Sequence, residues 1–470
     1  LTAYSSHGTS PLAITGLSSI NTYSNPIPAF RTLYTFSTNF GSGPNPGLAI
    51  SGNTLFGTTQ SGGISGLGNV FALNTDGTGF TNLFNNFNSS FTNGFRPAAG
   101  VILSGSTLYG TTYGGGTLGG GTVFALGTNG VGFTNLVNFD LNVNPNSPDE
   151  PQAPVVLSGN TLYGTTWYGG SYNHGTIFSV ATNGSSSSIL HAFYTPTYNP
   201  FANNYDGLFP SSKLIAVGGT LYGTAENGGM NGGGLVFSVV TNQPNSFTVL
   251  HYFSTPLNVT NSDGANSFAG LVLSGTNLYG TTFGGGTHGY GVVFAVSTNG
   301  LFFTNLYNFT GTNDGSQPHG GLTLSGNRLY GTTSAGGAYT NGTLFAINTD
   351  GSNFKSLYSF TGTGDGGNPQ ADLVLSGGTL YGTAEAGSVA TDGTVFSFTL
   401  TGPPLSIARS GTNVILTWSA SATGYTLQSS LQLGAAASWS AVSPLPVILS
   451  SLNTVTNSIS TTTKFYRLSQ

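Results

Sequence analysis

Short apolar segments separated by Gly, Asn, Ser and Thr recur along most of the chain. The phrase Leu-(Tyr/Phe)-Gly-Thr returns every 51–59 residues. It follows an apolar stretch such as GLVLSGTN (270–277) and precedes a glycine loop, a segment like GTVFAL (121–126) and a segment like FTNLVNF (133–139). Each unit therefore predicts four short β-strands joined by tight Gly/Asn turns. The glycines of the phrase are Gly57, Gly110, Gly164, Gly223, Gly280, Gly331 and Gly382.

A period of this length with four strands is typical of a β-propeller blade. The first full unit is preceded by a lone segment of the fourth type, FRTLYTF (30–36), and the last unit, which holds GTVFSF (393–398), lacks one. We therefore expect strand 30–36 to complete the last blade and hide its open edge. The predicted fold is all-β, a seven-bladed propeller of four-stranded blades followed by a small β-sandwich.

The glycines have two predicted roles. The glycine in the middle of LYGT is expected to allow close approach of a neighbouring backbone. The glycine run between the second and third strands, as in TYGGGTLGGGT (112–122), has no following helix and no Lys, which a phosphate-binding loop requires. We therefore interpret it as a loop at one end of a blade.

The chain divides into four predicted parts: an arm (1–28), the propeller (29–400), a linker (401–404) and a C-terminal domain (405–470). The last part has alternating strands and is similar to a fibronectin type III or immunoglobulin-like sandwich, with Trp418, Tyr425 and Tyr466 on its second, third and sixth strands. Six strands leave the edge beside KFYRLS (464–469) unpaired. The arm is expected either to dock on this edge of a neighbouring molecule or to pack on its own propeller.

Composition narrows the function classes. Only 4% of residues are charged, and eight Lys and Arg stand against 13 Asp and Glu, so nucleic acid is a poor partner. Zero Cys excludes disulfides and zinc–thiolate sites. Every long uncharged stretch is interrupted by polar residues, so no transmembrane segment is expected. The first residue is Leu1, which suggests that a signal peptide has been removed, and the polar, charge-poor composition favours an extracellular or cell-surface location.

Residues after LYGTT or LYGTA and in nearby loops are the candidate binding residues, because loops at one face of a propeller carry function. Aromatic rings interleaved with amides and carboxylates suit glycans. Glu226 and Glu385 come from units on opposite sides of the ring, which argues against a glycosidase pair. The candidate ligand-binding face comprises Tyr113, Trp167, Tyr168, Tyr172, Glu226, Phe283, Tyr290 and Glu385.

Four aspartates precede a glycine in the loops between units: Asp206, Asp263, Asp314 and Asp365. They are weak calcium candidates, because one carboxylate per loop is too few for a calcium site. The favoured interpretation is an Asp-Gly turn whose carboxylate binds nearby amides. We expect no cofactor and no metal. His191 and His251 occupy equivalent fourth-strand positions, which favours a structural role.

The repeat LVLSGNTLYGTT…GGG…GTVFALNTDGT…FTNLYNF resembles that of the choice-of-anchor GloVer-repeat proteins over about residues 29–400. That resemblance implies export and placement at the bacterial surface, and it supplies no catalytic residues. We expect a non-enzymatic structural or adhesive protein that associates with itself or with other extracellular proteins. Strand exchange of the arm would give a surface assembly or filament. The alternative is a glycan-binding or polysaccharide-processing propeller.

Overall fold

A computed structural model of the chain describes residues 2–5, 12–15, 19–22, 30–44, 47–85, 87, 92–141, 147–194, 206–243, 246–254, 260–386, 392–400, 405–419, 426–431, 438–449, 452–458 and 464–469. Within these ranges the regular secondary structure is β-strand and there is no helix. The described residues accordingly contain no helix suited to crossing a membrane. The predicted all-β class is confirmed.

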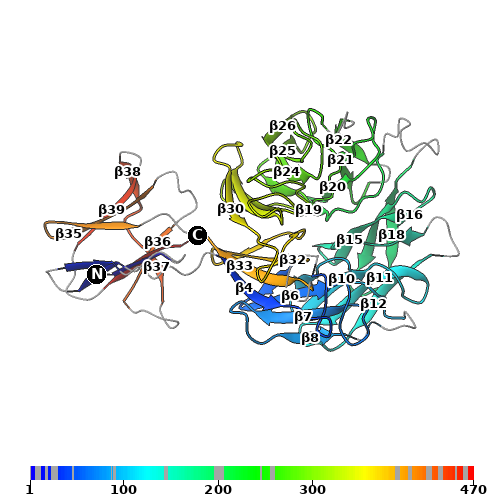
Figure 1. Cartoon of the computed structure of the whole chain (residues 1–470), viewed down its shortest axis with the longest axis horizontal. Coiled ribbons are helices and arrows are strands. Elements are labelled where there is room, and N and C mark those ends of the chain that lie inside the picture. Colours follow the sequence, from blue (N-terminus) through cyan, green and yellow to red (C-terminus); the bar gives the residue numbers. More distant parts are fainter. Residues whose placement is uncertain are drawn as a thin grey trace.

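Seven four-stranded antiparallel sheets, here called repeat sheets 1–7, follow the seven sequence units. Figure 1 shows them following one another in colour order from blue through cyan and green to yellow, with orange β33 beside blue β4. Repeat sheet 1 comprises β5 (Ala49–Ser51), β6 (Thr54–Thr59), β7 (Asn69–Asn74) and β8 (Thr81–Phe84). Repeat sheet 2 comprises β9 (Ile102–Ser104), β10 (Thr107–Thr112), β11 (Gly119–Gly127) and β12 (Thr134–Asp140). Repeat sheet 3 comprises β14 (Val156–Ser158), β15 (Thr161–Thr166), β17 (Thr176–Ala181) and β18 (Ser187–Ala192). Those of repeat sheets 4–7 are β19 (Ile215–Val217), β20 (Thr220–Ala225), β21 (Leu235–Val240), β22 (Thr248–Tyr252); β23 (Val272–Ser274), β24 (Asn277–Thr282), β25 (Val292–Ser297), β26 (Phe303–Asn308); β27 (Thr323–Ser325), β28 (Arg328–Thr333), β29 (Thr343–Asn348), β30 (Lys355–Ser359); β31 (Val374–Ser376), β32 (Thr379–Ala384), β33 (Thr394–Thr399) and β4 (Phe30–Thr35).

Repeat sheet 7 is completed by a strand from the other end of the repeat region. β4 pairs antiparallel with β33, and the register places Tyr34 opposite Val395 and Phe30 opposite Phe398. The pairing predicted for segments 30–36 and 393–398 is therefore confirmed. A register shift between Val395 and Phe396 recurs at the same place in the other repeat sheets, so β4 is equivalent to their fourth strands.

The glycine of LYGT makes room for an aromatic ring. A Cβ added at Gly331 would lie 2.6 Å from the ring of Phe345 on the paired strand, and one at Gly223 would lie 2.7 Å from the ring of Phe237. The atoms that exclude a side chain belong to a Phe ring of the third strand and, at Gly223, also to Leu214, so the expectation of a close backbone approach was wrong. These Phe rings are buried and form the cores between sheets.

Neighbouring repeat sheets are joined by aromatic stacking between their fourth strands. The ring on one fourth strand lies nearly parallel to a Phe at the start of the next fourth strand, at centroid distances of 3.6–4.1 Å. The predicted structural role of the two histidines is confirmed by these contacts. The stacked pairs are Tyr34–Phe80, Phe84–Phe133, His191–Phe247, His251–Phe303, Tyr307–Phe354 and Tyr358–Phe30.

β13 (Pro148–Asp149) and β16 (Tyr168–Gly169) form a short two-stranded sheet. The other remaining strands build two sheets from the two ends of the chain. A six-stranded sheet has the order β3-β2-β1-β40-β36-β37, and a four-stranded sheet has the order β34-β35-β39-β38. Trp418 and Tyr466 are fully buried in their common core, whereas Tyr425 lies outside the described residues. Trp418 lies on the second strand after residue 405, as predicted, but the described residues of this part form seven strands instead of the expected six, so Tyr466 lies on the seventh. These strands are β1 (Thr2–Ser5), β2 (Leu12–Thr15), β3 (Ser19–Thr22), β34 (Ser406–Ser410), β35 (Asn413–Ser419), β36 (Thr426–Ser430), β37 (Ser440–Ala441), β38 (Val447–Leu449), β39 (Leu452–Ser458) and β40 (Phe465–Ser469).

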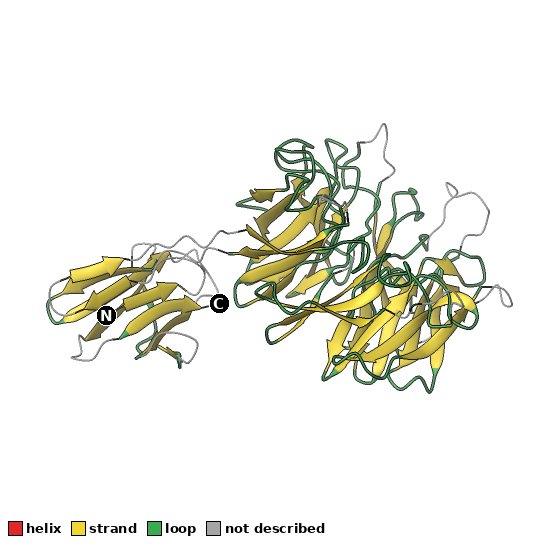
Figure 2. Ribbon diagram, turned by 60° about the horizontal axis from the view of Figure 1, so that its bottom comes forward, coloured by secondary structure: helices red, strands yellow, loops and turns green. Residues whose placement is uncertain are grey.

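The sheet edge beside KFYRLS is occupied, which corrects the sequence-based expectation of an unpaired edge. β1 pairs in parallel with β40, with Thr2 opposite Phe465 and Ser5 opposite Leu468. β2 and β3 extend the same sheet outward as an antiparallel hairpin. Figures 1 and 2 show the N-terminal strands within the terminal sheets and apart from the repeat sheets. The described arm residues therefore complete the terminal part of their own chain.

Candidate functional site

The ends of the second strands carry seven equivalent residues, here called the mouth residues. Each mouth residue donates its backbone N–H to the carbonyl of one residue in the loop leading into its own sheet, at 2.9–3.4 Å. Those seven loop residues all have positive φ, between 52° and 63°, although only one is glycine. The mouth residues are Gln60, Tyr113, Trp167, Glu226, Phe283, Ser334 and Glu385, and their loop partners are Gly43, Arg96, Glu150, Phe209, Asn266, Gln317 and Asn368.

A polar cavity of about 540 Å³ is lined by residues from all seven repeat sheets, among them the mouth residues Gln60, Tyr113, Trp167 and Glu226. Its volume falls within the ~300–1,000 Å³ range of small-molecule sites. Two of its aromatic rings, Tyr113 and Trp167, belong to mouth residues. Much of the rest of the wall is formed by the residues that lie two positions after the loop partners with positive φ. The side chains that carry its chemistry are Gln60, Arg96, Tyr113, Gln152, Trp167, Ser211, Lys213, Glu226, Phe268, His319, Gln370 and Asp372.

A second cavity of about 400 Å³ adjoins the polar one and shares with it five lining residues: Gly47, Pro154, Lys213, Gly270 and Asp372. Much of its wall is apolar and comes from the first strands of the repeat sheets, such as β19 and β31. The space between the sheets therefore changes from polar at the mouth residues to apolar along the first strands.

Burial changes the ionisation of the groups at the polar cavity. Desolvation raises the pKa of Glu226 to about 7, although a hydrogen bond with Asn227 opposes this change. Desolvation also lowers the pKa of His319, whose ring stacks on Phe268 at 4.8 Å. Near neutral pH the imidazole is therefore uncharged and the Glu226 carboxyl is partly protonated, so both groups can donate and accept hydrogen bonds.

Arg96, Tyr113 and Glu150 form a second polar group at the same mouth. The Arg96 guanidinium lies 5.3 Å from the centre of the Tyr113 ring, a cation–π geometry. Burial, together with the nearby Glu150 carboxyl, raises the pKa of Tyr113 to about 12. Desolvation raises the pKa of Glu150, and Arg96 partly opposes that shift. The phenol therefore remains protonated, and the Arg96 guanidinium interacts electrostatically with the Glu150 carboxyl.

Several buried polar atoms at this cavity have no hydrogen-bond partner among the described residues. Three of them, Nε2 of Gln152, Nε1 of Trp167 and Oγ of Ser211, belong to side chains that line the cavity. An unsatisfied buried polar atom costs about 1–3 kcal/mol. Two neighbouring repeat sheets, 3 and 4, therefore supply unused hydrogen-bonding capacity at one side of the cavity.

Three of the predicted face residues, Tyr113, Trp167 and Glu226, line the polar cavity. Tyr168 packs against Trp167 at 5.2 Å and contacts Phe209 edge-on at 5.5 Å, so it supports the cavity wall. Phe283, the mouth residue of repeat sheet 5, also supports the wall, because its ring contacts the rings of the lining residues Phe268 and His319.

The other predicted residues lie apart from the cavity lining. Tyr172 is 50% exposed and contacts Tyr194, and Tyr290 is 44% exposed with its ring against Gly311. Glu385 accepts hydrogen bonds from the side-chain amides of Asn368 and Gln370, at 2.9 and 2.6 Å. Desolvation raises its pKa. Its carboxylate positions Gln370, a side chain that does line the cavity.

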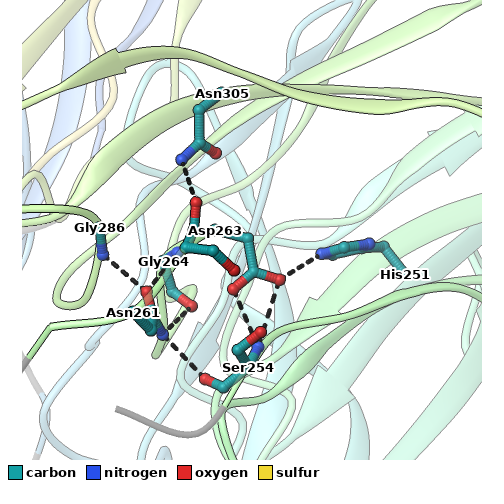
Figure 3. Close-up of polar contacts among 8 residues, drawn as sticks. His251, Ser254, Asn261, Asp263, Gly264, Gly286 and Asn305 are labelled. Atoms are coloured by element: carbon teal, nitrogen blue, oxygen red, sulfur yellow. Dashed lines mark hydrogen bonds and ion pairs between the residues drawn. The ribbon is translucent and has the colours of Figure 1, made fainter. Parts of the chain in front are cut away.

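The four loop aspartates are engaged by their own loops and fourth strands. Figure 3 shows Asp263, which accepts hydrogen bonds from the Ser254 N–H and lies 2.9 Å from Nε2 of His251. These contacts lower the pKa of Asp263 despite its burial. Asp314 and Asp365 accept bonds from the hydroxyls of Tyr307 and Tyr358 in the same way. Asp206 lies 3.5 Å from His191.

These contacts favour the turn interpretation over calcium binding. Each carboxylate lies in the loop after a fourth strand and contacts an imidazole or a phenol of that strand, so it holds the loop against the end of the strand. Within the described residues, no group of three or more His, Cys, Asp or Glu side chains is arranged to hold a metal ion.

Sequence reasoning missed much of the cavity wall: Arg96, Gln152, Ser211 and Gln370. The sequence did carry a signal, because a proline recurs at the same place in these units. In the structure this proline directly follows the residue with positive φ, and the examples are Pro97, Pro151, Pro210 and Pro369. The residue after that proline varies between units and lines the cavity in most of them.

The chain belongs to the family of the Gloeobacter/Verrucomicrobia repeat, whose sequence profile matches residues 15–208 and 209–442. The two matches together cover most of the chain, so it is a tandem-repeat protein. No curated protein sequence matches it.

Solved structures resemble the chain only loosely. The nidogen/laminin complex is 16% identical over 63% of this chain and 88% of that chain, with a TM-score of 0.33. A puromycin-hydrolysing peptidase of Mycobacterium tuberculosis is 12% identical over 89% of this chain and 62% of that chain, with a TM-score of 0.47. An oligogalacturonate lyase in complex with manganese is 11% identical over 77% and 89% of the two chains, with a TM-score of 0.43.

Proposed function

We propose that the seven repeat sheets are the blades of a closed seven-bladed β-propeller spanning about residues 29–400. Three observations support this proposal. β4 completes repeat sheet 7, Tyr34 of that sheet stacks on Phe80 of repeat sheet 1 at 4.0 Å, and every repeat sheet contributes to one polar cavity. A closed ring leaves the blades with short, covered edges. Residues 405–470, together with the arm, form the second proposed domain, a sandwich of the fibronectin type III or immunoglobulin-like kind.

We further propose that the protein is a non-enzymatic extracellular structural or adhesive protein that assembles by exchange of its N-terminal strands. The parallel pairing of β1 with β40 carries this proposal. β1 comes from the opposite end of the chain and is held by backbone pairing to an edge that would otherwise be open. The same strand of a second molecule fits the same edge, and a head-to-tail exchange of this kind propagates into a filament.

Single-cysteine chains test the exchange directly, because the native chain has no Cys. Tyr4 and Arg467 are partners in the β1–β40 register, and the neighbouring positions Tyr466 and Leu468 are buried. One chain carries Tyr4→Cys and a second carries Arg467→Cys. The two are mixed at high concentration and treated with a short bis-maleimide. Exchange gives a cross-linked pair of different chains on a denaturing gel.

A chain with both substitutions is the control, because it reports pairing within one molecule. Efficient cross-linking of the double variant with none between the single variants would show that the strands stay in their own chain, which would refute exchange. A deletion of residues 1–24 retains β4, so it should give folded monomers that do not assemble in negative-stain images.

Glycan binding is the second candidate function, and the polar cavity favours it. Tyr113, Trp167 and Glu226, which were predicted as part of a glycan-binding face, line this cavity together with amide side chains. Screening the full chain on an array of neutral and acidic saccharides tests it. This result is independent of the cross-linking result, because the cavity lies among the repeat sheets and β40 lies in the terminal sheets.

A further inference from the structure

We infer that the polar cavity is a binding site for a neutral, hydroxyl-rich ligand, namely the terminal residues of a saccharide chain. The inference rests on the second candidate function and gives it a location, a set of side chains and a ligand charge. The cavity is lined by four of the mouth residues and by residues from all seven repeat sheets. Its size of about 540 Å³ suits a ligand of one to a few sugar rings.

The aromatic wall is held in place by its neighbours. Trp167 is contacted edge-on by Phe209 at 5.7 Å and at a tilt by Tyr168 at 5.2 Å. Tyr113 is held beside Arg96. Large rings with two rotatable bonds give contact area at a small entropic cost, and their faces pack well on the C–H faces of a sugar.

The polar wall matches hydroxyl groups in both directions of hydrogen bonding. Gln152 and Gln370 each offer an amide donor and an amide acceptor, and Ser211 offers a hydroxyl. The unpartnered atoms of Gln152, Trp167 and Ser211 lie at one side of the cavity, in repeat sheets 3 and 4. A sugar, whose hydroxyls both donate and accept, can use this capacity after small side-chain rotations.

The charges around the cavity favour a neutral ligand. Arg96 lies near the Glu150 carboxyl, and Asp372 accepts a hydrogen bond from the Gly321 N–H at 2.6 Å. Lys213 and Asp372 both line the cavity and have opposite charges. A phosphate or a uronic acid would need a cation without a counter-charge, because burying an unpaired anion is costly.

The test uses the full chain on an array of di- and trisaccharides based on glucose, galactose, mannose and xylose, with uronic acid oligosaccharides as the anionic arm. The best neutral binder is then titrated by calorimetry against three variants. Trp167→Ala removes the main ring, and Ala98→Trp places an indole at another lining position without removing a polar group. Tyr172→Ala is the matched control, because Tyr172 is an exposed ring outside the cavity lining.

We expect at least a tenfold loss of affinity in Trp167→Ala and in Ala98→Trp, with Tyr172→Ala unchanged. Thermal melting confirms that each variant is folded. Neutral-saccharide binding that survives both cavity variants would keep glycan binding and overturn the cavity as its site. Binding of uronic acid oligosaccharides alone would overturn the neutral ligand. No binding to any saccharide on the array would overturn both the site and the second candidate function.

Discussion

The repeat sheets and the terminal sheets are built from the same kind of strand but are assembled in different ways. In six repeat sheets every strand pairs with strands of its own sequence unit, and in the seventh only β4 comes from elsewhere. In the six-stranded terminal sheet, β1 pairs with β40 at the opposite end of the chain. Local pairing loses little chain entropy, whereas joining the two chain ends requires the largest loop closure available.

The difference shows where each region is vulnerable. A repeat sheet depends on a few positions that recur in every unit, such as Gly331 under the ring of Phe345. The terminal sheets have no such repetition, and their core depends on single residues such as Trp418 and Tyr466. A weakened repeat is still supported by its neighbours on both sides, while a displaced β1 leaves the edge of β40 open.

One junction between repeat sheets departs from the rest. Six junctions have an aromatic stack between fourth strands, but between repeat sheets 2 and 3 the corresponding residues are Val137 and Ser187. This junction therefore offers a comparison within the repeat region itself.

The largest effect on stability is expected from a truncation that damages the repeat sheets as well as the terminal sheets. Removing residues 1–36 deletes β4 and with it the packing of Phe30, Leu33, Tyr34 and Phe36, each worth about 1.5–3 kcal/mol if fully buried. We expect aggregation, or a fall in melting temperature on the order of 10 °C or more. Removing residues 1–24 is the control and should leave the main melting transition unchanged. Equal behaviour of the two truncations would show that β4 is dispensable.

The next largest effect on stability is expected from the loss of one aromatic stack between fourth strands. Phe303→Ala removes a ring that lies 3.6 Å from His251 and also contacts Phe253 and Phe294. We expect a loss of about 3 kcal/mol in the free energy of unfolding, measured by urea denaturation. Leu301→Ala, at a position that is 87% exposed, should have no measurable effect. A loss below about 1 kcal/mol would mean that the stack adds little to the junction.

Glu226 makes stability depend on pH. Its pKa is raised in the folded protein to about 7 from a usual value of 4.5, so the folded state holds a proton that the unfolded state releases. Stability should therefore fall as pH rises from about 4.5 to 7, by about 2 kcal/mol after allowance for solvent.

The variant Glu226→Gln should lose this part of the pH dependence. It should be more stable than the native protein at pH 8, with the two closer at pH 5, in urea denaturation at each pH. Asp76→Asn is the control, because the pKa of the exposed Asp76 is lowered by Thr78 and it stays ionised throughout this range. Parallel pH curves for the native protein and Glu226→Gln would contradict the predicted protonation.

The smallest expected effect is a gain. Ser187→Phe restores the missing ring between repeat sheets 2 and 3, where it can pack on Val137 and on Phe178 of its own sheet. By analogy with the other junctions we expect a stabilisation of about 0.5–1 kcal/mol. Ser185→Phe adds the same ring at an exposed turn position and should not stabilise. A neutral or negative result at position 187 would show that this junction is packed differently from the other six.

The sequence by itself determined the repeating unit. The spacing of LYGT, the apolar runs and the Ser-Gly-Asn turns predicted four strands per unit, and the lone segment 30–36 predicted the pairing of β4 with β33. Hairpins of this kind are specified by residues close together in the sequence, and the hairpin glycines have the positive φ that was expected, such as 60° at Gly275. Tyr113, Trp167 and Glu226 were found by their repeated position alone.

Only the tertiary structure decided which side chains meet across repeats and across the chain ends. It joined Gln152, Ser211 and Gln370 to the mouth residues, because the cavity wall is assembled from loops of different repeat sheets. It paired β1 with β40 of the same chain, whereas the sequence predicted docking of the arm on this edge of a neighbouring molecule or packing on its own propeller, because backbone pairing at a sheet edge is nearly independent of side chains. Neither the partner of an open edge nor the lining of a shared cavity is encoded in one local segment.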